Sequence, residues 1–471
     1  MEQTRRKFIA TAAAGTIASV VAPKVLAGES AENAVINSPT VVPQSAFGAN
    51  SRIRIAVLGV NGRGVELYST IMRNAAAENV AVTTLCDPDM NILQTKAKAF
   101  EERFSQKVAI QQDFRKVFEN KDIDAVVLAT PNHWHTLLAI YACQAGKDVY
   151  VEKPGTHNVA EGRKLIEAAY KYNRIVQHGV QLRSNTAVRE AMQHLRDGLI
   201  GRVYMSRGLV FRQRADIGDK GISKVPAGVD YDLWCGPAQM VPFTENLVHY
   251  NWHWHWNYGN GDVGNQGIHE TDLCMWGLDV GLPERITSMG GKFLWDDCKE
   301  VPEVQTSVYH YPKEKKMIQF EVRHWHTNNE GGATVGNIFY GEKGYLVVNH
   351  YSSYESFLYT SATNTPQDTS SGALPRGPRI QPGPSNKASG EMDAHFKNWF
   401  EAIRARDMTL QNGPVETAHL SSALAHLGNI SCRLGRQLEF DPVAERCIND
   451  EDANFMLTRQ YRAPYLMPEK I

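Results

Sequence analysis

The sequence has almost no net charge and no pattern of paired cysteines. It contains 50 lysines and arginines against 51 acidic residues, which gives a formal net charge of −1. This balance argues against nucleic acid as a partner, because phosphate backbones are bound by strongly basic surfaces. The seven cysteines are scattered singly, without a C-x-x-C pair, and their odd number excludes complete pairing within the chain. We therefore expect no disulfide framework.

The apolar stretch near the N-terminus is not a membrane span. Residues 9–22 form a run that is too short and too rich in alanine to cross a bilayer. The run follows a twin arginine and precedes Ala27, a small residue at a suitable cleavage point. This order is typical of a twin-arginine export signal over residues 1–27, followed by a linker over 28–50; a disordered basic leader is the alternative. The signal predicts a periplasmic or otherwise exported protein that is not integral to the membrane.

The rest of the chain is long enough for two domains, and its first part alternates strands with helices. The 471 residues include 42% hydrophobic and 21% charged residues, as is ordinary for a globular protein. The alternation from residue 51 to 178 predicts a doubly wound parallel sheet, the Rossmann arrangement. Strands are expected at 53–58, 80–86, 124–130, 148–151 and 175–178, and helices at 90–104, 133–145 and 159–172.

Strands dominate from residue 179 to 440. This pattern predicts an α+β domain, with a mostly antiparallel sheet and helices on one face. Residues 361–390 are rich in Ser, Pro, Gly and Thr and are expected to form a long surface loop, and 441–471 a C-terminal arm. The expected strands are 203–212, 285–295, 303–312, 316–325, 333–340 and 344–349, and the expected helices are 184–197, 265–278, 391–406 and 414–434.

A glycine-rich turn joins the first strand to the following helix. The turn, residues 59–64, reads G-V-N-G-R-G, with Asn61 in place of the middle glycine of G-x-G-x-x-G. Glycines let the backbone approach a pyrophosphate, and the helix N-terminus offers it unpaired N–H groups. The second strand ends at Asp87, whose carboxylate can accept both ribose hydroxyls of NAD and repel the 2′-phosphate of NADP. This context predicts NAD binding; an ordinary strand–helix turn is the alternative.

Two further motifs follow strands of the same sheet. Thr130-Pro131-Asn132 and, shortly after, His135 follow the third expected strand, and Glu152-Lys153-Pro154 follows the fourth. Ligands bind at the carboxyl ends of the strands in doubly wound folds. Lys153 is therefore well placed to contact a nicotinamide ring or a substrate hydroxyl; a surface salt bridge with Glu152 is the alternative.

A polar helix in the second domain carries a candidate base. Asn265, His269 and Asp272 lie at positions i, i+4 and i+7, so one helical face would present all three. A histidine backed by polar groups suits a general base, because its ordinary pKa of about 6.5 lies near neutrality.

These motifs together resemble the Gfo/Idh/MocA family of nicotinamide-dependent sugar oxidoreductases, over most of residues 52–440. The resemblance rests on the glycine turn, Thr130-Pro131, Glu152-Lys153-Pro154 and the G-x-H-x-x-D block that contains His269. It implies that Lys153 lies beside the nicotinamide and the substrate hydroxyl and that His269 is the base. The family usually has an aspartate where this chain has Asn265, and Asp262 is a candidate for the missing carboxylate.

An aromatic run precedes this block. Trp252, Trp254 and Trp256 would share one side of an extended segment and could stack on sugar rings; a packed domain junction is the alternative. Gln181 and Arg183 are further substrate-side candidates. The His-x-His pairs of the chain have no third ligand nearby in the sequence, so no metal is expected.

The predicted site therefore consists of three groups of residues. The catalytic residues are Lys153 and His269. The cofactor-binding residues are Gly59, Asn61, Gly62, Arg63, Gly64, Asp87, Thr130, Pro131, Asn132, His135, Glu152 and Lys153. The substrate-binding residues are Asn265, Asp272, Asp262, Gln181, Arg183, Trp252, Trp254 and Trp256.

The function expected from these residues is NAD-dependent oxidation of a sugar or glycoside hydroxyl to a keto sugar. Since free NAD is scarce outside the cytoplasm, an exported enzyme should hold its cofactor tightly and recycle it. One alternative is a redox-neutral glycosidase or lyase that oxidises C3 transiently, and another is a non-catalytic sugar-binding module. The C-terminal sheet is expected to form a homo-oligomer.

Overall fold

The computed structural model describes residues 52–325, 327–359 and 380–471. The predicted export signal and linker lie outside the described residues, as do residues 361–379 of the predicted surface loop. All seven cysteines are described, and none of them forms a disulfide. None of the helices in the described ranges is long and apolar enough to cross a membrane.

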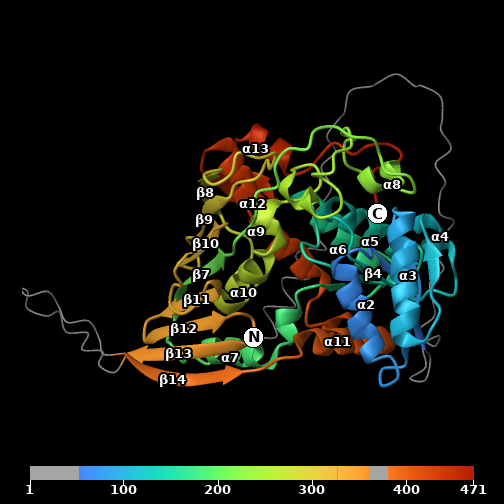
Figure 1. Cartoon of the computed structure of the whole chain (residues 1–471). Helices are drawn as coiled ribbons and strands as arrows, with labels where there is room; N and C mark the ends of the chain where they lie inside the picture. Colours follow the sequence, from blue (N-terminus) through green and yellow to red (C-terminus); the bar gives the residue numbers. More distant parts are fainter. Residues whose placement is uncertain (1–51, 326, 360–379) are drawn as a thin grey trace, which may run out of the picture. The chain divides into compact units, whose positions relative to one another are not determined.

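The first half of the chain forms a six-stranded parallel sheet (Figure 1). The strand order β3-β2-β1-β4-β5-β6 is doubly wound, with its switch point between β1 and β4. Every residue of β4 and β5 is buried, which explains why these strands read as continuous apolar runs. The strands are β1 (Ile53–Leu58), β2 (Val80–Cys86), β3 (Ala109–Gln111), β4 (Ala125–Leu128), β5 (Asp148–Val151) and β6 (Val176–His178).

Helices pack on both faces of this sheet. One face shares an apolar core with α5 (Asn132–Gln144) and α6 (Val159–Lys171). The other shares a core with α2 (Arg63–Arg73), α3 (Met90–Phe104) and the sequence-distant α11 (Glu391–Ala405). The first sheet is therefore completed by a C-terminal helix. Sequence analysis missed β3 and α4 (Phe114–Glu119), because segments this short show no clear periodicity.

The second half forms a ten-stranded sheet in the order β14-β13-β12-β11-β7-β10-β9-β8-β15-β16. All its neighbouring strands pair antiparallel except β7 and β10, which are parallel. The predicted fold class is therefore confirmed. The strands are β7 (Val203–Phe211), β8 (Arg285–Gly291), β9 (Val304–Tyr311), β10 (Lys316–Arg323), β11 (Val335–Gly341), β12 (Gly344–Asn349), β13 (Ser353–Tyr359), β14 (Ile380–Lys387), β15 (Leu438–Asp441) and β16 (Arg446–Cys447).

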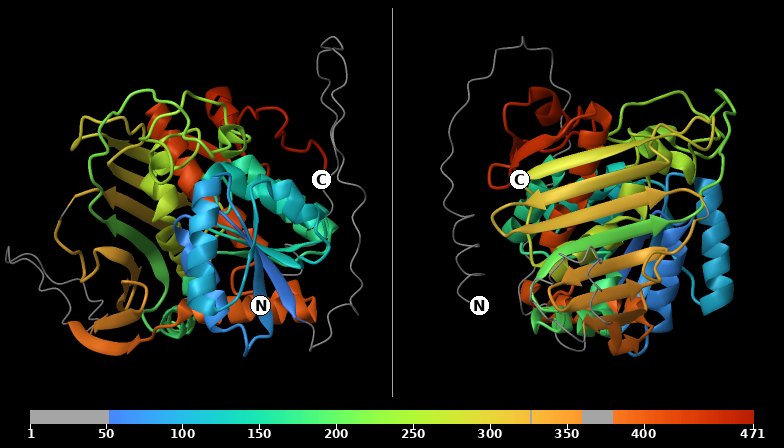
Figure 2. Two further views of the ribbon diagram at one scale, coloured as in Figure 1. Left: turned by 45° about the vertical axis from the view of Figure 1, so that its right-hand side comes forward. Right: turned by 90° about the vertical axis from the view of Figure 1, so that its left-hand side faces the viewer.

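Helices cover one face of this larger sheet. Residues of α7 (Thr186–Arg196), α10 (Ile268–Leu278) and α12 (Val415–Leu434) share an apolar core with it. The right-hand view of Figure 2 shows the opposite face, over which no described helix lies. The short helical segments are α8 (Tyr231–Cys235), α9 (Gly261–Asn265), α13 (Glu451–Met456) and the 3-10 turns η2 (Gln181–Ser184), η3 (Asn251–Trp254) and η5 (Met408–Leu410).

Two secondary-structure predictions are wrong. Residues 380–387 belong to an edge strand that pairs with β13, although they were expected to lie in a loop. An edge strand tolerates the prolines at 382 and 384 that suggested the loop. The helix expected over 265–278 begins only at Ile268, because Asn265 is the last residue of a separate short helix, α9.

Candidate active site

The glycine turn brings the backbone of β1 close to that of β4. Gly59 has φ +83°, and a β-carbon there would lie 2.5 Å from the carbonyl oxygen of Ala129. A β-carbon on Gly64 would lie only 1.9 Å from the carbonyl oxygen of Gly59. Both positions therefore require glycine. The N-cap of α2, Gly62, supplies no side-chain acceptor, so the helix start is free to receive an anion.

Asp87 lies at the carboxyl end of β2, beside this turn. One of its carboxylate oxygens accepts from Val60 N at 3.0 Å and the other from Asp89 N at 3.1 Å. Burial raises the pKa of the Asp87 carboxyl, and these two backbone donors oppose the rise. Each oxygen keeps capacity to accept a ribose hydroxyl. A 2′-phosphate would face the Asp87 carboxylate, so the residues present fit NAD.

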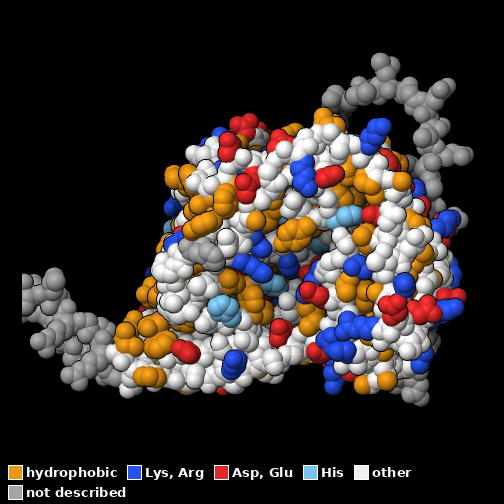
Figure 3. All heavy atoms as spheres, viewed as in Figure 1, with side chains coloured by type: hydrophobic (Ala, Val, Ile, Leu, Met, Phe, Trp, Pro, Cys, Tyr) orange, Lys and Arg blue, Asp and Glu red, His pale blue; other side chains and the backbone are white. Residues whose placement is uncertain are grey.

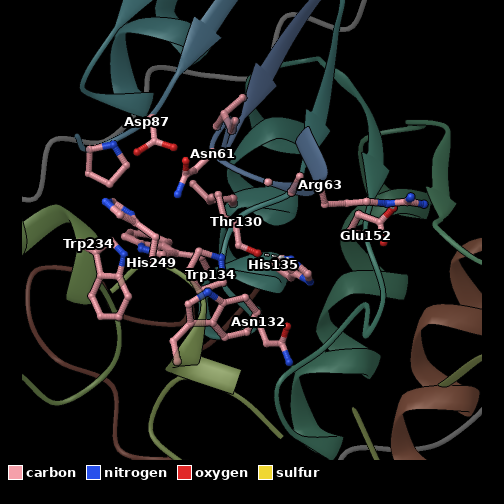
Figure 4. Close-up of a pocket in the computed structure, with 18 of the residues that line it drawn as sticks. Asn61, Arg63, Asp87, Thr130, Asn132, Trp134, His135, Glu152, Trp234 and His249 are labelled. Atoms are coloured by element: carbon pink, nitrogen blue, oxygen red, sulfur yellow. Dashed lines mark hydrogen bonds and ion pairs between the residues drawn. The ribbon is translucent and has the colours of Figure 1, made fainter. Parts of the chain in front are cut away.

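Residues from the second half of the chain close this end of the pocket. Trp234, His249, Tyr250 and Trp252 line the same pocket as Asp87. The Nε2 atom of His249 lies 3.0 Å from a carboxylate oxygen of Asp89. Figure 4 shows Asp87 and His249 on one side of the pocket, with Arg63 and Glu152 on the other. Trp234 and His249 were not predicted from the sequence, although His249 lies only three residues before Trp252.

Arg63 and Glu152 form an ion pair at the opposite side of the pocket. Arg63 Nε donates to Glu152 at 2.9 Å, and another nitrogen of the same guanidinium donates to Glu66 at 2.6 Å. Burial alone would raise the pKa of Glu152, but the Arg63 and Lys153 cations hold it below its ordinary value. The ammonium of Lys153 instead donates to the backbone and side-chain oxygens of Asn265, at 2.7 and 3.2 Å. The alternative of a surface salt bridge between Lys153 and Glu152 is therefore wrong.

Residues 130–135 connect the pocket wall to the lysine loop. Thr130, Pro131, Asn132 and His135 all line the pocket. The two ring nitrogens of His135 lie 2.6 Å from the carbonyl oxygen of Pro154 and 2.7 Å from that of Thr130. His135 thus holds the two predicted strand-end motifs together. The hydroxyl of Thr130 is buried and has no partner among the described residues.

His269 lies in the first turn of α10 and is 5% exposed. Its Nδ1 atom is buried without a hydrogen-bond partner among the described residues. Burial, with the nearby Lys153 and Arg63 cations, holds the pKa of His269 well below its ordinary value. The imidazole is therefore neutral near pH 7, which is the form that can accept a proton.

The two aspartates proposed for the substrate site are engaged in ion pairs. Asp262 accepts two hydrogen bonds from Arg214, at 2.6 and 2.8 Å, and one from the amide of Asn265 at 3.2 Å. Asp272 accepts from Arg183 at 2.7 and 2.9 Å, and from a serine hydroxyl of α12 at 2.6 Å. Burial favours the neutral form of Asp262, but the Arg214 cation lowers its pKa.

Because α9 and α10 are separate helices, Asn265, His269 and Asp272 do not share one face of a single helix. Asn265 ends one helix and His269 and Asp272 belong to the next, so their i, i+4, i+7 relationship is not that of one continuous helix. The side-chain oxygen of Gln181 is buried without a hydrogen-bond partner within the described ranges, and Gln181 is not among the residues that line the pocket.

The tryptophan run is not extended. Residues 251–254 form the turn η3, and of the three tryptophans only Trp252 lines the pocket. Trp254 is buried, with its ring 5.5 Å from that of His324 and beneath the guanidinium of Arg214. The ring of Trp256 lies under the guanidinium of Arg433. The prediction that all three form one stacking surface is wrong, because the turn sends the side chains to different neighbours.

The pocket opens into a hollow on one face of the molecule. Lys, Arg and His side chains gather in this hollow, between hydrophobic groups (Figure 3). Within the described part of the chain, no group of three or more His, Cys, Asp or Glu side chains could hold a metal ion.

Comparison with known proteins matches both halves of the chain to one family. Residues 53–180 match the model described as "Oxidoreductase family, NAD-binding Rossmann fold". Residues 216–286 and 385–467 match the partner model, "Oxidoreductase family, C-terminal alpha/beta domain". The chain belongs to the Gfo/Idh/MocA family. Its NAD-binding domain and its place among the oxidoreductases follow from these matches.

Among curated relatives, the chain is 31% identical over 170 residues to a glycosyl hydrolase family 109 protein from Saccharopolyspora erythraea. That match spans 35% of this chain and 36% of the relative, so the chain covers about a third of the relative's length.

Solved structures share the fold over a longer range. Aldose-aldose oxidoreductase from Caulobacter crescentus, complexed with glycerol, has a TM-score of 0.61 at 17% identity, covering 83% of this chain and 100% of that one. Levoglucosan dehydrogenase in complex with NADH and levoglucosan has a TM-score of 0.58 at 17% identity, covering 83% of this chain and 99% of that one. At these identities the likeness establishes the fold alone.

Proposed function

We propose that this protein is an NAD-dependent oxidoreductase that oxidises a hydroxyl of a sugar or glycoside to a keto sugar. The observation that carries the proposal is the position of Lys153, half-buried in the wall of the nucleotide pocket and near the buried imidazole of His269. Lys153 lines that pocket, and its charge lowers the pKa of His269. The sugar-acting enzymes among the proteins of the same fold support this substrate class.

The chain's residues have distinct roles in this reaction. When bound, NAD would accept the hydride from the carbon that bears the reacting hydroxyl. His269 removes the hydroxyl proton, which a neutral imidazole can accept. Lys153 has three N–H donors and uses two on Asn265, so one remains for the reacting oxygen. Asn265 holds the ammonium in place, while Glu152 stays paired with Arg63.

A second candidate is a redox-neutral glycosidase. In that reaction, oxidation at C3 acidifies the neighbouring C–H, the glycosidic bond is eliminated, water adds, and the hydride returns to the sugar. The curated relative named as a glycosyl hydrolase favours this alternative. The same lysine and histidine would serve it, so the net product distinguishes the two reactions.

We also propose that the cofactor is held tightly and recycled in a protein exported by a twin-arginine signal. Support for retention comes from the segment that carries Trp234, His249 and Trp252, because these side chains line the pocket from outside the parallel sheet. Release of the nucleotide would require this segment to move. Protein purified without added nucleotide and then denatured should release NAD; release of no nucleotide, or mainly of NADP, would contradict retention.

Self-association through the ten-stranded sheet is a further part of the proposal. On the sheet face away from the helices, Tyr345 and Phe357 belong to an apolar cluster separate from the helix-side core, and they stack with ring centroids 4.7 Å apart. Partly buried aromatic groups of this kind suit an interface between copies. Light scattering of the purified protein gives the oligomeric state directly.

The test of the main function is spectroscopic. Purified protein is mixed with a panel of mono- and disaccharides while absorbance at 340 nm is followed and products are analysed. A persistent 340 nm band with a keto-sugar product supports the oxidoreductase. Release of a free monosaccharide without net NADH supports the glycosidase. Binding of sugars without either product would indicate a non-catalytic module.

A further inference from the structure

The connection between β12 and β13 holds two bulky residues in a left-handed backbone conformation. His350 has φ +44° and Tyr351 has φ +64°, and the amide of Ser352 donates to the carbonyl of Asn349 at 3.4 Å. Two successive left-handed residues form the turn that Asn-Gly favours, because other side chains crowd the backbone there. Bulky residues keep this strained conformation only where the surrounding structure holds them in it, and such residues cluster at functional sites.

Buried polar groups fix the side chain of Tyr351. Its hydroxyl donates to a carboxyl oxygen of Glu270 at 2.6 Å and accepts a hydrogen bond from the amide of Gln266. Glu270 is fully buried, and its second carboxyl oxygen has no partner among the described residues. Gly208 on β7 makes room for the start of this side chain, because a β-carbon there would lie 2.9 Å from that of Glu270.

The same tyrosine packs against the predicted base. The ring centroids of Tyr351 and His269 are 5.4 Å apart, and the rings are inclined at 57°. A histidine base is usually oriented by a hydrogen bond to its second ring nitrogen. No such bond is made to Nδ1 of His269 by the described residues. The ring of Tyr351 is therefore one of the contacts that restrain the imidazole.

We propose that Tyr351 is a positioning residue for His269, anchored by Glu270 and Gln266. The inference rests on the proposed function, in which His269 is the base. The left-handed turn places the phenol ring of Tyr351 against the imidazole of His269, whereas a glycine at position 351 would remove this contact. Since Glu270 follows His269 on α10, Tyr351 contacts two successive residues of the helix and fixes the first relative to the second.

The alternative is that Tyr351 only fills space beside the apolar core of the sheet. That role predicts a loss of stability with no particular effect on His269. A positioning role predicts a fall in kcat with little change in the sugar KM, and a change in the orientation of the imidazole. The two accounts therefore differ in measurable ways.

Three variants separate them. Tyr351→Gly relieves the backbone and removes the ring, whereas Tyr351→Phe keeps the ring and removes the hydroxyl. His350→Gly is the matched control, because it relieves the neighbouring left-handed residue, whose ring nitrogens contact Asn349 and Thr334 at the surface. All three are compared with the parent full-length protein for melting temperature, NAD binding, kcat and sugar KM.

We expect Tyr351→Gly to lower kcat by about 10- to 100-fold, as displacement of a catalytic group by about 1 Å does, with NAD binding retained. Tyr351→Phe should recover part of this loss, and His350→Gly should keep the parent kcat. Parent-like kcat in Tyr351→Gly, or an equal loss in His350→Gly, would overturn the proposal.

A crystal structure of Tyr351→Gly tests the positioning without any activity. A changed imidazole orientation supports the proposal, and an unchanged one overturns it. If the parent protein oxidises no sugar, the proposed function fails, but this structural comparison still decides whether Tyr351 orients His269.

Discussion

The ammonium group of Lys153 is held by both oxygens of Asn265, the backbone oxygen at 2.7 Å and the side-chain oxygen at 3.2 Å. The amide of Asn265 in turn donates to Asp262, which is already paired with Arg214. The lysine is thus connected to a carboxylate through a neutral residue. Burial lowers the pKa of Lys153, and the charges of Glu152 and Asp262 oppose this effect only in part. Because asparagine replaces the usual aspartate at position 265, the pKa of Lys153 is lower than it would be beside a carboxylate there.

Replacing Asn265 with Asp should raise the pKa of Lys153. An adjacent carboxylate typically shifts the pKa of a partner by about 1–3 units toward the charged form. The ionisation of Lys153 should produce one limb of the plot of kcat/KM against pH. In the variant this limb should therefore move to higher pH by about one unit or more. A pH profile of Asn265→Asp with the oxidised sugar measures this shift. An unchanged profile would mean that Lys153 does not titrate in the reaction.

Loss of His269 should remove the base without removing the cofactor. His269→Ala is expected to lower kcat by about 10²- to 10⁴-fold, the usual contribution of general-base catalysis. Lys153→Ala should be similarly impaired, since it removes the remaining donor to the reacting oxygen. NAD binding by fluorescence titration checks that the pocket is intact. His194→Ala, at a partly exposed position of α7, is the control. Near-normal kcat in His269→Ala would point to another base, with Asp262 the next residue to change.

Asp87 should determine the preference for NAD over NADP. Asp87→Asn keeps a side-chain acceptor but removes the charge that faces the ribose, so repulsion of a 2′-phosphate falls. We expect the ratio of NAD to NADP affinity to fall by about tenfold, as one lost charge contact of about 1.4 kcal/mol would give. Isothermal titration with both nucleotides measures the ratio. An unchanged ratio would mean that Asp87 does not discriminate between the two nucleotides.

The sequence predicted the parts of the site that are local in the chain. The glycine turn, Asp87 and the two strand-end motifs each follow a strand, and parallel strands deliver their ends to one edge of a sheet. These residues line one pocket for that reason. Fold class followed in the same way from the alternation of strands and helices, whereas β3 and α4 were too short to detect.

The missed features depend on contacts between distant residues. His249 contacts Asp89 from 160 positions away, and no local pattern marks that pairing. The tryptophan run has a period of two, but the turn at 251–254 removes the extended geometry that the period assumes. Tyr351 lies in a turn whose backbone favours glycine or asparagine, so its residue type pointed away from the conformation that it adopts.

Trp252 and Trp254 should have different roles, the first in ligand binding and the second in packing alone. Trp252→Ala is expected to weaken ligand binding in addition to lowering stability, because Trp252 is buried in an apolar cluster and also lines the pocket. Trp254→Ala should instead lower stability by about 3–5 kcal/mol, the usual cost of removing a buried tryptophan. Thermal unfolding and ligand titration of both variants check the division. A Trp254→Ala protein that is fully stable but has lost sugar binding would restore Trp254 to the substrate site.

Glu270 should make stability fall as pH rises. Burial raises the pKa of this carboxyl group to about 8, against the bond from Tyr351 that lowers it. The charged groups that affect it from neighbouring elements are Asp262, which raises its pKa, and Lys153, which lowers it. Between the unfolded value of about 4.3 and the folded value, the native state keeps a proton that the unfolded state has lost.

In that window the free energy of unfolding should decrease with pH, by up to about 1.4 kcal/mol per unit from this group. Glu270→Gln keeps a neutral side chain of similar shape and removes the proton, so its stability relative to the parent should increase steadily from pH 5 to pH 8. Glu401→Gln, at an exposed position of α11, controls for the general effect of removing a carboxylate. Urea unfolding of the three proteins at several pH values measures the difference. If the free energies of unfolding of Glu270→Gln and the parent differ by the same amount across this range, Glu270 is ionised in the folded protein. Its carboxylate would then accept the hydrogen bond from Tyr351 as a charged group.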